Sequence, residues 1–126
     1  MATAYIDTSA LIAIAFGETG AEALARRVNA FGERLAANLL EAEYRAAHAR
    51  EGRTPDLSPL ASLTWVAPSR PLSGEIGRVL DAGRVRGADC WHLATALFVD
   101  PTAGALTFVT LDARQKAVAK ALGFRT

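Results

Sequence analysis

The chain has 126 residues and a formal net charge of +1, and 51% of its residues are hydrophobic. This length and apolar content predict a single domain over residues 1–126, with a core that needs no disulfide. Cys90 is the only cysteine, no apolar run approaches the roughly 20 residues of a membrane span, and the N-terminus lacks a basic signal region. We therefore expect a cytoplasmic protein with no membrane association. The small net charge excludes a polyanion-binding field over the whole surface.

The pattern of apolar residues predicts short strands that alternate with helices. In chain order we expect a strand over 4–6, helices over 10–16 and 20–28, a strand over 34–37, a helix over 39–50, a strand over 63–66, helices that begin at 73 and near 89, a strand over 105–111 and a helix over 113–122. Asn38, Ser58 and Ser73 are suitable N-caps for the segments that follow them. This alternation favours an α/β fold with a parallel sheet.

An acidic residue follows each of two expected strands. Asp7 comes directly after the first strand and precedes Thr8 and Ser9, and Asp112 comes directly after the last strand. Ligand crevices of open α/β sheets lie outside the carboxyl ends of the strands, so both acids are candidates for a functional site. Both also have a structural interpretation, because each can cap the helix that follows it. Thr110 could orient a carboxylate or a water, or pack as a β-branched residue.

Glu43 is an acid in the apolar stripe of an expected helix. At 100° per residue it falls within the arc of Leu39, Leu40 and Ala47. A buried carboxylate without a partner is costly, so Glu43 needs a cation, a hydrogen-bond network or a raised pKa. An ion pair with an arginine is the structural alternative.

Asp89 stands near the start of a dense run over residues 88–97. If a helix begins there, Asp89 is either its N-cap or a third acid of the site. His92 lies one turn further on, and we interpret it as a structural residue with satisfied hydrogen bonds, not as a metal ligand. Cys90 is interpreted as a small buried apolar residue.

The four acids would form a carboxylate cluster if the first and last strands are neighbours in the sheet. Two carboxylates about 4 Å apart repel by roughly 4 kcal/mol at an effective dielectric constant of about 20, so such a cluster needs a counter-cation. Oxygen ligands suit Mg²⁺ or Mn²⁺, and the sequence has no His/Cys cluster with zinc spacing. A divalent ion could lower the pKa of a bound water for in-line attack on a phosphate, which is the chemistry of phosphodiester hydrolysis.

Four segments of the chain carry a family resemblance. They are residues 5–11, 40–46, 88–96 and 109–112, followed at a distance by 121–123. In this order they resemble the four signature blocks of PIN-domain ribonucleases, and within that group the chain looks most like the VapC toxins of bacterial type II toxin–antitoxin systems. The resemblance spans almost the whole chain, and four blocks in the correct order are more specific than any one acid.

The resemblance implies a three-layer α/β/α domain with a central parallel sheet flanked by helices. It implies an acidic site made of Asp7, Glu43, Asp89 and Asp112 that binds Mg²⁺ or Mn²⁺. It also implies endonucleolytic cleavage of RNA, inhibition by a cognate VapB-like antitoxin, and a homodimer that assembles with the antitoxin into a hetero-oligomer.

Other residues are expected to assist these acids. Supporting roles fall to Thr8, Ser9 and Thr110. Basic side chains could hold RNA phosphates, with an ordinary solvated charge as the alternative for each. These basic residues are Arg84, Arg86, Arg114 and Lys116.

The chain departs from the family at two places. Cys90 and Trp91 occupy positions where the family usually has small or aliphatic residues. The segment over 52–71 is short and rich in turns, so the helical part that often lines the substrate groove could be reduced. Neither departure removes a proposed ligand.

Two other classes of protein remain as alternatives. A phospho-receiver domain also has acids at strand ends, but this chain lacks the adjacent acid pair after the first strand. A non-catalytic interaction module would keep the fold as a binding surface. Loss of an acid would be its mark, and all four acids are present.

Overall fold

The computed structural model describes residues 2–126 and contains a four-stranded sheet and six α-helices within that range. In chain order the elements are β1 (Thr3–Ile6), α1 (Thr8–Ala15), α2 (Ala21–Asn29), β2 (Glu33–Ala37), α3 (Leu39–Arg50), a 3₁₀ helix (Ser58–Ser62), β3 (Thr64–Val66), α4 (Ser73–Ala82), α5 (Gly87–Val99), β4 (Thr107–Val109) and α6 (Ala113–Leu122). Across these residues, none of the helices has the length and apolar character required to cross a membrane.

The four strands are all parallel and lie in the order β3-β2-β1-β4. β1 is therefore an inner strand, with Tyr5 beside Leu35 of β2 on one side and beside Phe108 of β4 on the other. This pairing makes the first and last strands neighbours. The predicted parallel sheet is confirmed, although β4 is much shorter than the strand expected over residues 105–111.

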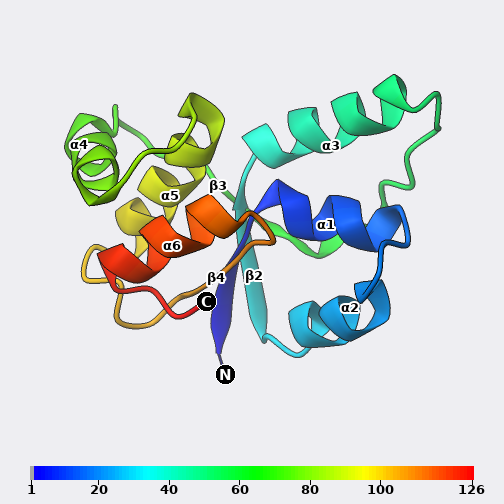
Figure 1. Ribbon diagram of the computed structural model, residues 1–126, viewed down its shortest axis with the longest axis horizontal. Helices are drawn as coiled ribbons and strands as arrows, with labels where there is room; N and C mark the ends of the chain where they lie inside the picture. Colours follow the sequence, from blue (N-terminus) through cyan, green and yellow to red (C-terminus); the bar gives the residue numbers. More distant parts are fainter. Residues whose placement is uncertain (1) are drawn as a thin grey trace.

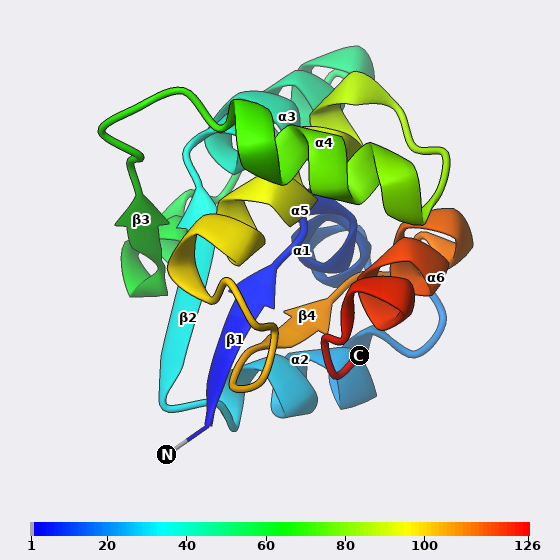
Figure 2. The same ribbon diagram turned by 90° about the vertical axis from the view of Figure 1, so that its left-hand side faces the viewer.

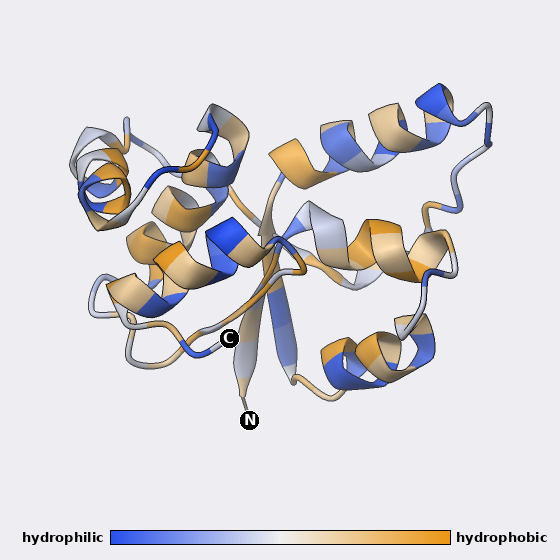
Figure 3. Cartoon of the chain, viewed as in Figure 1, coloured by the Kyte–Doolittle hydropathy of each residue, from blue (hydrophilic) through white to orange (hydrophobic). Residues whose placement is uncertain are grey.

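Helices cover both faces of the sheet and form the three layers that the sequence predicts (Figure 1). α1, α2 and α3 lie on one side, and α4, α5 and α6 lie on the other. Figure 2 shows the twisted sheet from the side of α4, which packs against α5. α1 contacts both α2 and α3, which explains why it is apolar nearly all round, whereas those two helices mix hydrophobic and hydrophilic residues (Figure 3).

Side-chain alternation along β1 divides the core into two parts. Tyr5 packs with the α5 side of the sheet, where Leu93, Leu97 and Phe108 are fully buried. Ala4 and Ile6 point to the opposite side and pack with residues of α1 and α3. A strand buried on both faces is what an inner parallel strand requires, and its short apolar sequence follows from that position.

The predicted helix caps are only partly correct. Gly123 ends α6 in the left-handed conformation, with φ of 106°, as its position suggested. Asn38 makes no side-chain capping bond to α3, because its amide donates to Glu41 instead. Ser58 and Ser73 also fail as N-caps, since each is the first residue of its helix and makes no capping bond.

Candidate functional site

The site lies where the strand order reverses. From β1 the chain proceeds to β2 and β3 on one side, and it returns to β4 on the other side of β1. Open α/β sheets bind their ligands outside the carboxyl ends of the strands at such a reversal. Asp7 follows β1 and donates its backbone N–H to Val109 at the end of β4, at 2.9 Å. The two strand-end acids, Asp7 and Asp112, therefore flank one crevice.

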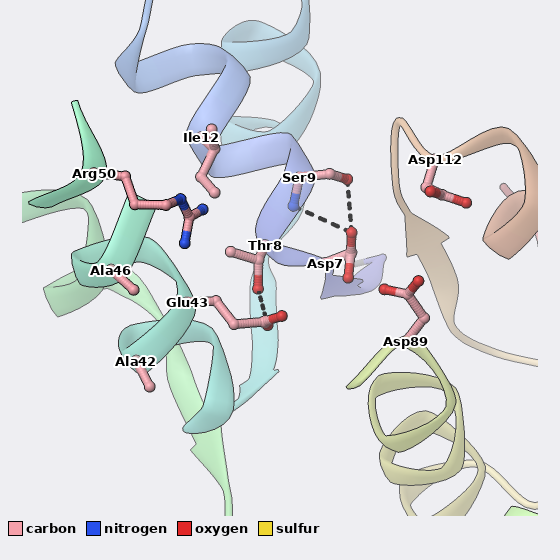
Figure 4. Close-up of a pocket in the computed structure, with 10 residues that line it drawn as sticks. All are labelled: Asp7, Thr8, Ser9, Ile12, Ala42, Glu43, Ala46, Arg50, Asp89 and Asp112. Atoms are coloured by element: carbon pink, nitrogen blue, oxygen red, sulfur yellow. Dashed lines mark hydrogen bonds between the residues drawn. The ribbon is translucent and has the colours of Figure 1, made fainter. Parts of the chain in front are cut away.

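A cavity of about 440 Å³ opens at this point. Its walls come from α1, α3, α5 and the start of α6, so elements from both ends of the chain contribute to it (Figure 4). The residues that line it are Asp7, Thr8, Ser9, Ile12, Ala42, Glu43, Ala46, Arg50, Asp89 and Asp112. All four acids predicted from the sequence are present, and we call Asp7, Glu43, Asp89 and Asp112 the four cavity acids.

Asp7 is almost completely buried, at 4% exposure, and hydrogen bonds surround its carboxylate. Oδ2 accepts from the Ser9 N–H at 3.1 Å, from the Ser9 hydroxyl at 2.6 Å and from the Thr110 hydroxyl at 3.2 Å. Oδ1 accepts from the Gln115 amide at 3.2 Å. The bond from the Ser9 N–H caps α1, so the structural interpretation of Asp7 is correct. Oδ1 nevertheless retains a lone pair toward the cavity.

Glu43 points across the cavity mouth (Figure 4), and it pairs with no arginine of residues 2–126. Its Oε1 accepts from the Thr8 hydroxyl and from His92 Nε2, each at 2.7 Å. Burial raises the pKa of Glu43, but these hydrogen bonds and the nearby imidazole outweigh that effect, so the pKa lies below its usual value. Of the solutions expected for this acid, the fold uses a hydrogen-bond network, and not the arginine pair that was the structural alternative.

His92 belongs to a fully buried chain of hydrogen bonds that links Glu43 to the core. The Ala37 N–H donates to the Tyr5 hydroxyl at 3.1 Å, and that hydroxyl donates to His92 Nδ1 at 2.8 Å. An ionised carboxylate only accepts, so the proton on His92 lies on Nε2 and is donated to Glu43. The prediction of a satisfied structural histidine agrees with these contacts. Its direct bond to a cavity acid was not foreseen.

Asp89 and Asp112 lie on the side of the cavity formed by α5 and α6. Asp89 is the third residue of α5, and Arg86 precedes the helix, so Asp89 is not the N-cap. Asp112 caps α6 by accepting from the Gln115 N–H at 2.7 Å. Burial raises the pKa of Asp89 above its usual value, and the negative charges of the other three cavity acids raise it further. The crevice thus concentrates negative charge.

The donor set of the cavity fits a cation that prefers oxygen ligands. No hydrogen bond from residues 2–126 reaches Glu43 Oε2, Asp112 Oδ2 or either carboxylate oxygen of Asp89. Carboxylate oxygens are the ligands of Mg²⁺ and Mn²⁺. Within the described part of the chain, however, no three acidic, histidine or cysteine side chains come close enough together, as they stand, to hold one ion.

Two of the predicted basic residues line a second cavity beside the first. Arg86 and Arg114 form its walls together with Asp89 and Asp112, and its volume is also about 440 Å³. Arg84 lies in a neighbouring depression with Arg114. Arg86 and Arg114 are therefore close to Asp89 and Asp112, whereas the depression that Arg84 lines contains no acid.

The structure brings in residues that the sequence interpretation did not select. Gln115 spans Asp7 and Thr110: its Nε2 donates to Asp7, and its Oε1 lies 2.7 Å from the Thr110 hydroxyl, whose single proton is shared between Gln115 and Asp7. Arg50 lines the cavity of the acids from the end of α3. Lys116, which was selected, is half-buried on α6 beside Gln115.

Comparison with known proteins identifies the class of this fold and site. The chain belongs to the PIN domain family, which matches residues 4–121 and so includes all four cavity acids. No curated protein and no solved structure matches the chain significantly. PIN domains are typically nucleases and generally use divalent metal ions, so membership suggests a hydrolase that acts on nucleic acids.

The raised pKa of Asp89 leads to a prediction about stability. Asp89→Asn should raise the melting temperature of the protein at pH 7 in the presence of a chelator, because it removes a charge that the folded state disfavours. For a carboxyl with a raised pKa, stability is lost as the pH rises through the folded-state pKa. The gain should therefore vanish as the pH falls toward the ordinary aspartate value of about 3.9.

Asp81→Asn is the matched control for this measurement. Asp81 lies on the exposed side of α4 and makes no ion pair within residues 2–126. Thermal unfolding of the three proteins from about pH 3.5, just below that reference value, to about pH 8 provides the comparison. Equal melting temperatures for Asp89→Asn and the wild type at pH 7 would contradict the crowding of charge described above.

Proposed function

We propose that the protein is a Mg²⁺- or Mn²⁺-dependent endoribonuclease that hydrolyses phosphodiester bonds of RNA. The observation that carries this proposal is the convergence of four acids from four separate elements on one open cavity at the reversal of strand order. A structural role requires no such convergence. Membership of a family of nucleases supports the same conclusion.

Glu43, Asp89 and Asp112 would hold the divalent ion through carboxylate oxygens that no donor of residues 2–126 occupies, and Asp7 would hold it through the remaining lone pair of Oδ1. A bound divalent ion would supply charge to the phosphate and lower the pKa of the attacking water. The chain's own residues prepare this arrangement. Ser9, Thr110 and Gln115 fix Asp7 so that Oδ1 faces the cavity, and His92 and Thr8 keep Glu43 ionised with Oε2 free.

The proposed reaction requires both water and an internal phosphodiester to reach the acids. Glu43 is the most suitable acid to orient the attacking water, because it is part-exposed at the cavity mouth and its pKa is lowered. The water oxygen forms a bond to phosphorus, the bond to the leaving ribose oxygen breaks, and the proton passes to solvent or to that leaving oxygen. The cavity is open and has arginines beside it, so it can accommodate an RNA strand that continues on both sides of the cleaved bond.

Purified protein should cleave RNA with Mg²⁺ or Mn²⁺ and not with a chelator. Asp89→Asn should lower the cleavage rate by more than about a hundredfold, because loss of a ligand should exceed the 10–100-fold typical of an outer partner. Asp7→Asn should have an equal effect, although its amide would face the donors of Ser9 and Gln115 and could also reduce stability. Gel analysis of a labelled RNA measures both rates.

Asp89→Asn keeps this test independent of folding, since it is expected to be more stable than the wild type. Asp81→Asn is again the control and should cleave normally. Full activity of Asp89→Asn, or cleavage that persists in a chelator, would refute the metal-dependent mechanism.

One observation favours the non-catalytic alternative. As the side chains stand in residues 2–126, no three of the acids are close enough to share an ion. Titration calorimetry with Mn²⁺ separates the two functions, because a nuclease site must bind the ion and a protein-binding surface need not. Absence of binding by the wild type would favour an interaction module.

We further propose that the nuclease acts as a toxin controlled by a VapB-like antitoxin, and the order of the four sequence blocks supports this role. Induced expression in a bacterial host should stop growth, and Asp89→Asn should restore it. The product of a small neighbouring reading frame that encodes a DNA-binding protein should also restore growth when coexpressed. Normal growth during expression of an active nuclease would remove the toxin role and leave the nuclease.

The proposed toxin is also expected to form a homodimer. Apolar side chains of Ile76, Leu80 and Trp91 border a depression on α4 and α5, and Leu80 is 52% exposed, which supports self-association. Sedimentation of the purified protein at micromolar concentration should give the mass of two chains. Leu80→Lys should shift the protein toward monomer, whereas a wild-type monomer would contradict the expected dimer.

A further inference from the structure

Arg50 is a cation at the end of a cavity whose other charged walls are acidic. It stands two helical turns after Glu43, so both side chains lie on the same face of α3, with their backbones roughly 10 Å apart along the helix axis. In Figure 4 the Arg50 guanidinium points over the cavity toward Thr8 and Ile12, and the carboxylate of Asp89 lies on the far side of Asp7.

The guanidinium of Arg50 has no protein partner within residues 2–126, unlike several other arginines of the chain. Arg45, on the same helix, pairs with Glu41 at 2.6 Å. Arg70 pairs with Glu75, and Arg53 lies over the Phe16 ring. Among the residues that the structure describes, Arg50 makes neither an ion pair nor a stacking contact, although Glu43 is on its own helix face. Its five donors are therefore free for an anion.

The wall between Glu43 and Arg50 consists of small or apolar residues. Ala46 of α3 lies between Glu43 and Arg50, and Ile12 of α1 borders the same part of the cavity (Figure 4). The short alanine side chain leaves room for a ligand beside the helix, and the apolar side chains make no hydrogen bonds of their own with it. A sugar or a base could lie here while the phosphates on either side contact charged groups.

The acids are bordered by arginines on two sides. The first cavity runs from Arg50 to Asp89 and Asp112, and the second runs from those same two acids to Arg86 and Arg114. A divalent ion offsets acidic charge only near the bond that is cut. Phosphates further along the RNA strand need other cations, and Arg50 is a cation that lines this cavity on the α3 side.

We propose that Arg50 binds a phosphodiester of the RNA strand on one side of the cleaved bond, so that the strand runs along α3 from the four cavity acids to the end of that helix. This inference rests on the proposed nuclease function and specifies where its substrate lies. Arginine suits the role because its planar group donates two parallel hydrogen bonds to phosphate oxygens. Ala46 and Ile12 form the surface under the intervening nucleoside.

The test compares Arg50→Gln with Arg45→Gln on a short RNA that the wild type cuts at one position. Loss of a charged phosphate contact should lower kcat/KM about tenfold or more for Arg50→Gln, chiefly through KM. The slope of log KM against log salt should also fall by about one unit. Arg45→Gln, which removes an exposed charge paired with Glu41, should match the wild type in both measurements.

A set of RNA substrates with one methylphosphonate each identifies the phosphate concerned. Neutralising the phosphate held by Arg50 should impair the wild type and Arg45→Gln but should have little further effect on Arg50→Gln. Arg50→Lys should recover part of the lost affinity. Circular dichroism verifies that all variants are folded.

The possible outcomes separate this inference from the function on which it rests. If the wild type cuts RNA and Arg50→Gln cuts it with unchanged KM and salt dependence, Arg50 does not bind substrate, and the nuclease assignment stands. If the same methylphosphonate impairs Arg50→Gln as strongly as the wild type, the assigned phosphate is wrong. If the wild type cuts no RNA with Mn²⁺, both the inference and the proposed function fail.

Discussion

The burial of the Asp7 carboxylate is the constraint on which the arrangement of the site depends. A buried charge that loses its partners costs about 3–5 kcal/mol, so the fold must surround it with donors. These donors come from the first turn of α1, from the segment after β4 and from α6, through Ser9, Thr110 and Gln115. The Asp7 carboxylate therefore has all its donors only when β1 pairs with β4, α1 begins at Thr8 and α6 is in place.

A second hydrogen-bond chain joins the two helical layers over the carboxyl edge of the sheet. Glu43 comes from α3 and His92 from α5, which lie on opposite faces of the sheet, and their side chains meet at 2.7 Å. Tyr5 anchors this chain in the core, since its ring stacks on Phe108 with centroids 5.2 Å apart. The orientation of a cavity acid is thus coupled to core packing through Tyr5 and His92.

Local patterns predicted the elements well, because apolar periodicity determines which segments must be buried. The order of the strands depends on tertiary contacts. The sequence therefore identified Asp7 and Asp112 as candidates but could not predict that their strands are neighbours. The contacts of His92 and Gln115 could not be predicted for the same reason, since their partners lie 49 and 108 positions away in the sequence. Arg50 is different. The helical period that places Glu43 toward the cavity places Arg50 on the same face two turns later. The sequence alone could therefore have predicted the position of Arg50.

The distance along the chain between Asp7 and its donors has a consequence for synthesis. Thr110 and Gln115 are 103 and 108 positions from Asp7, so the crevice cannot close until the ribosome has produced nearly all of the residues described here. Contacts of such long range form late in folding, because the entropy of closing the loop must first be overcome. A nascent chain therefore carries Asp7 with Ser9 but without Thr110 and Gln115, so the crevice is complete only after translation of α6.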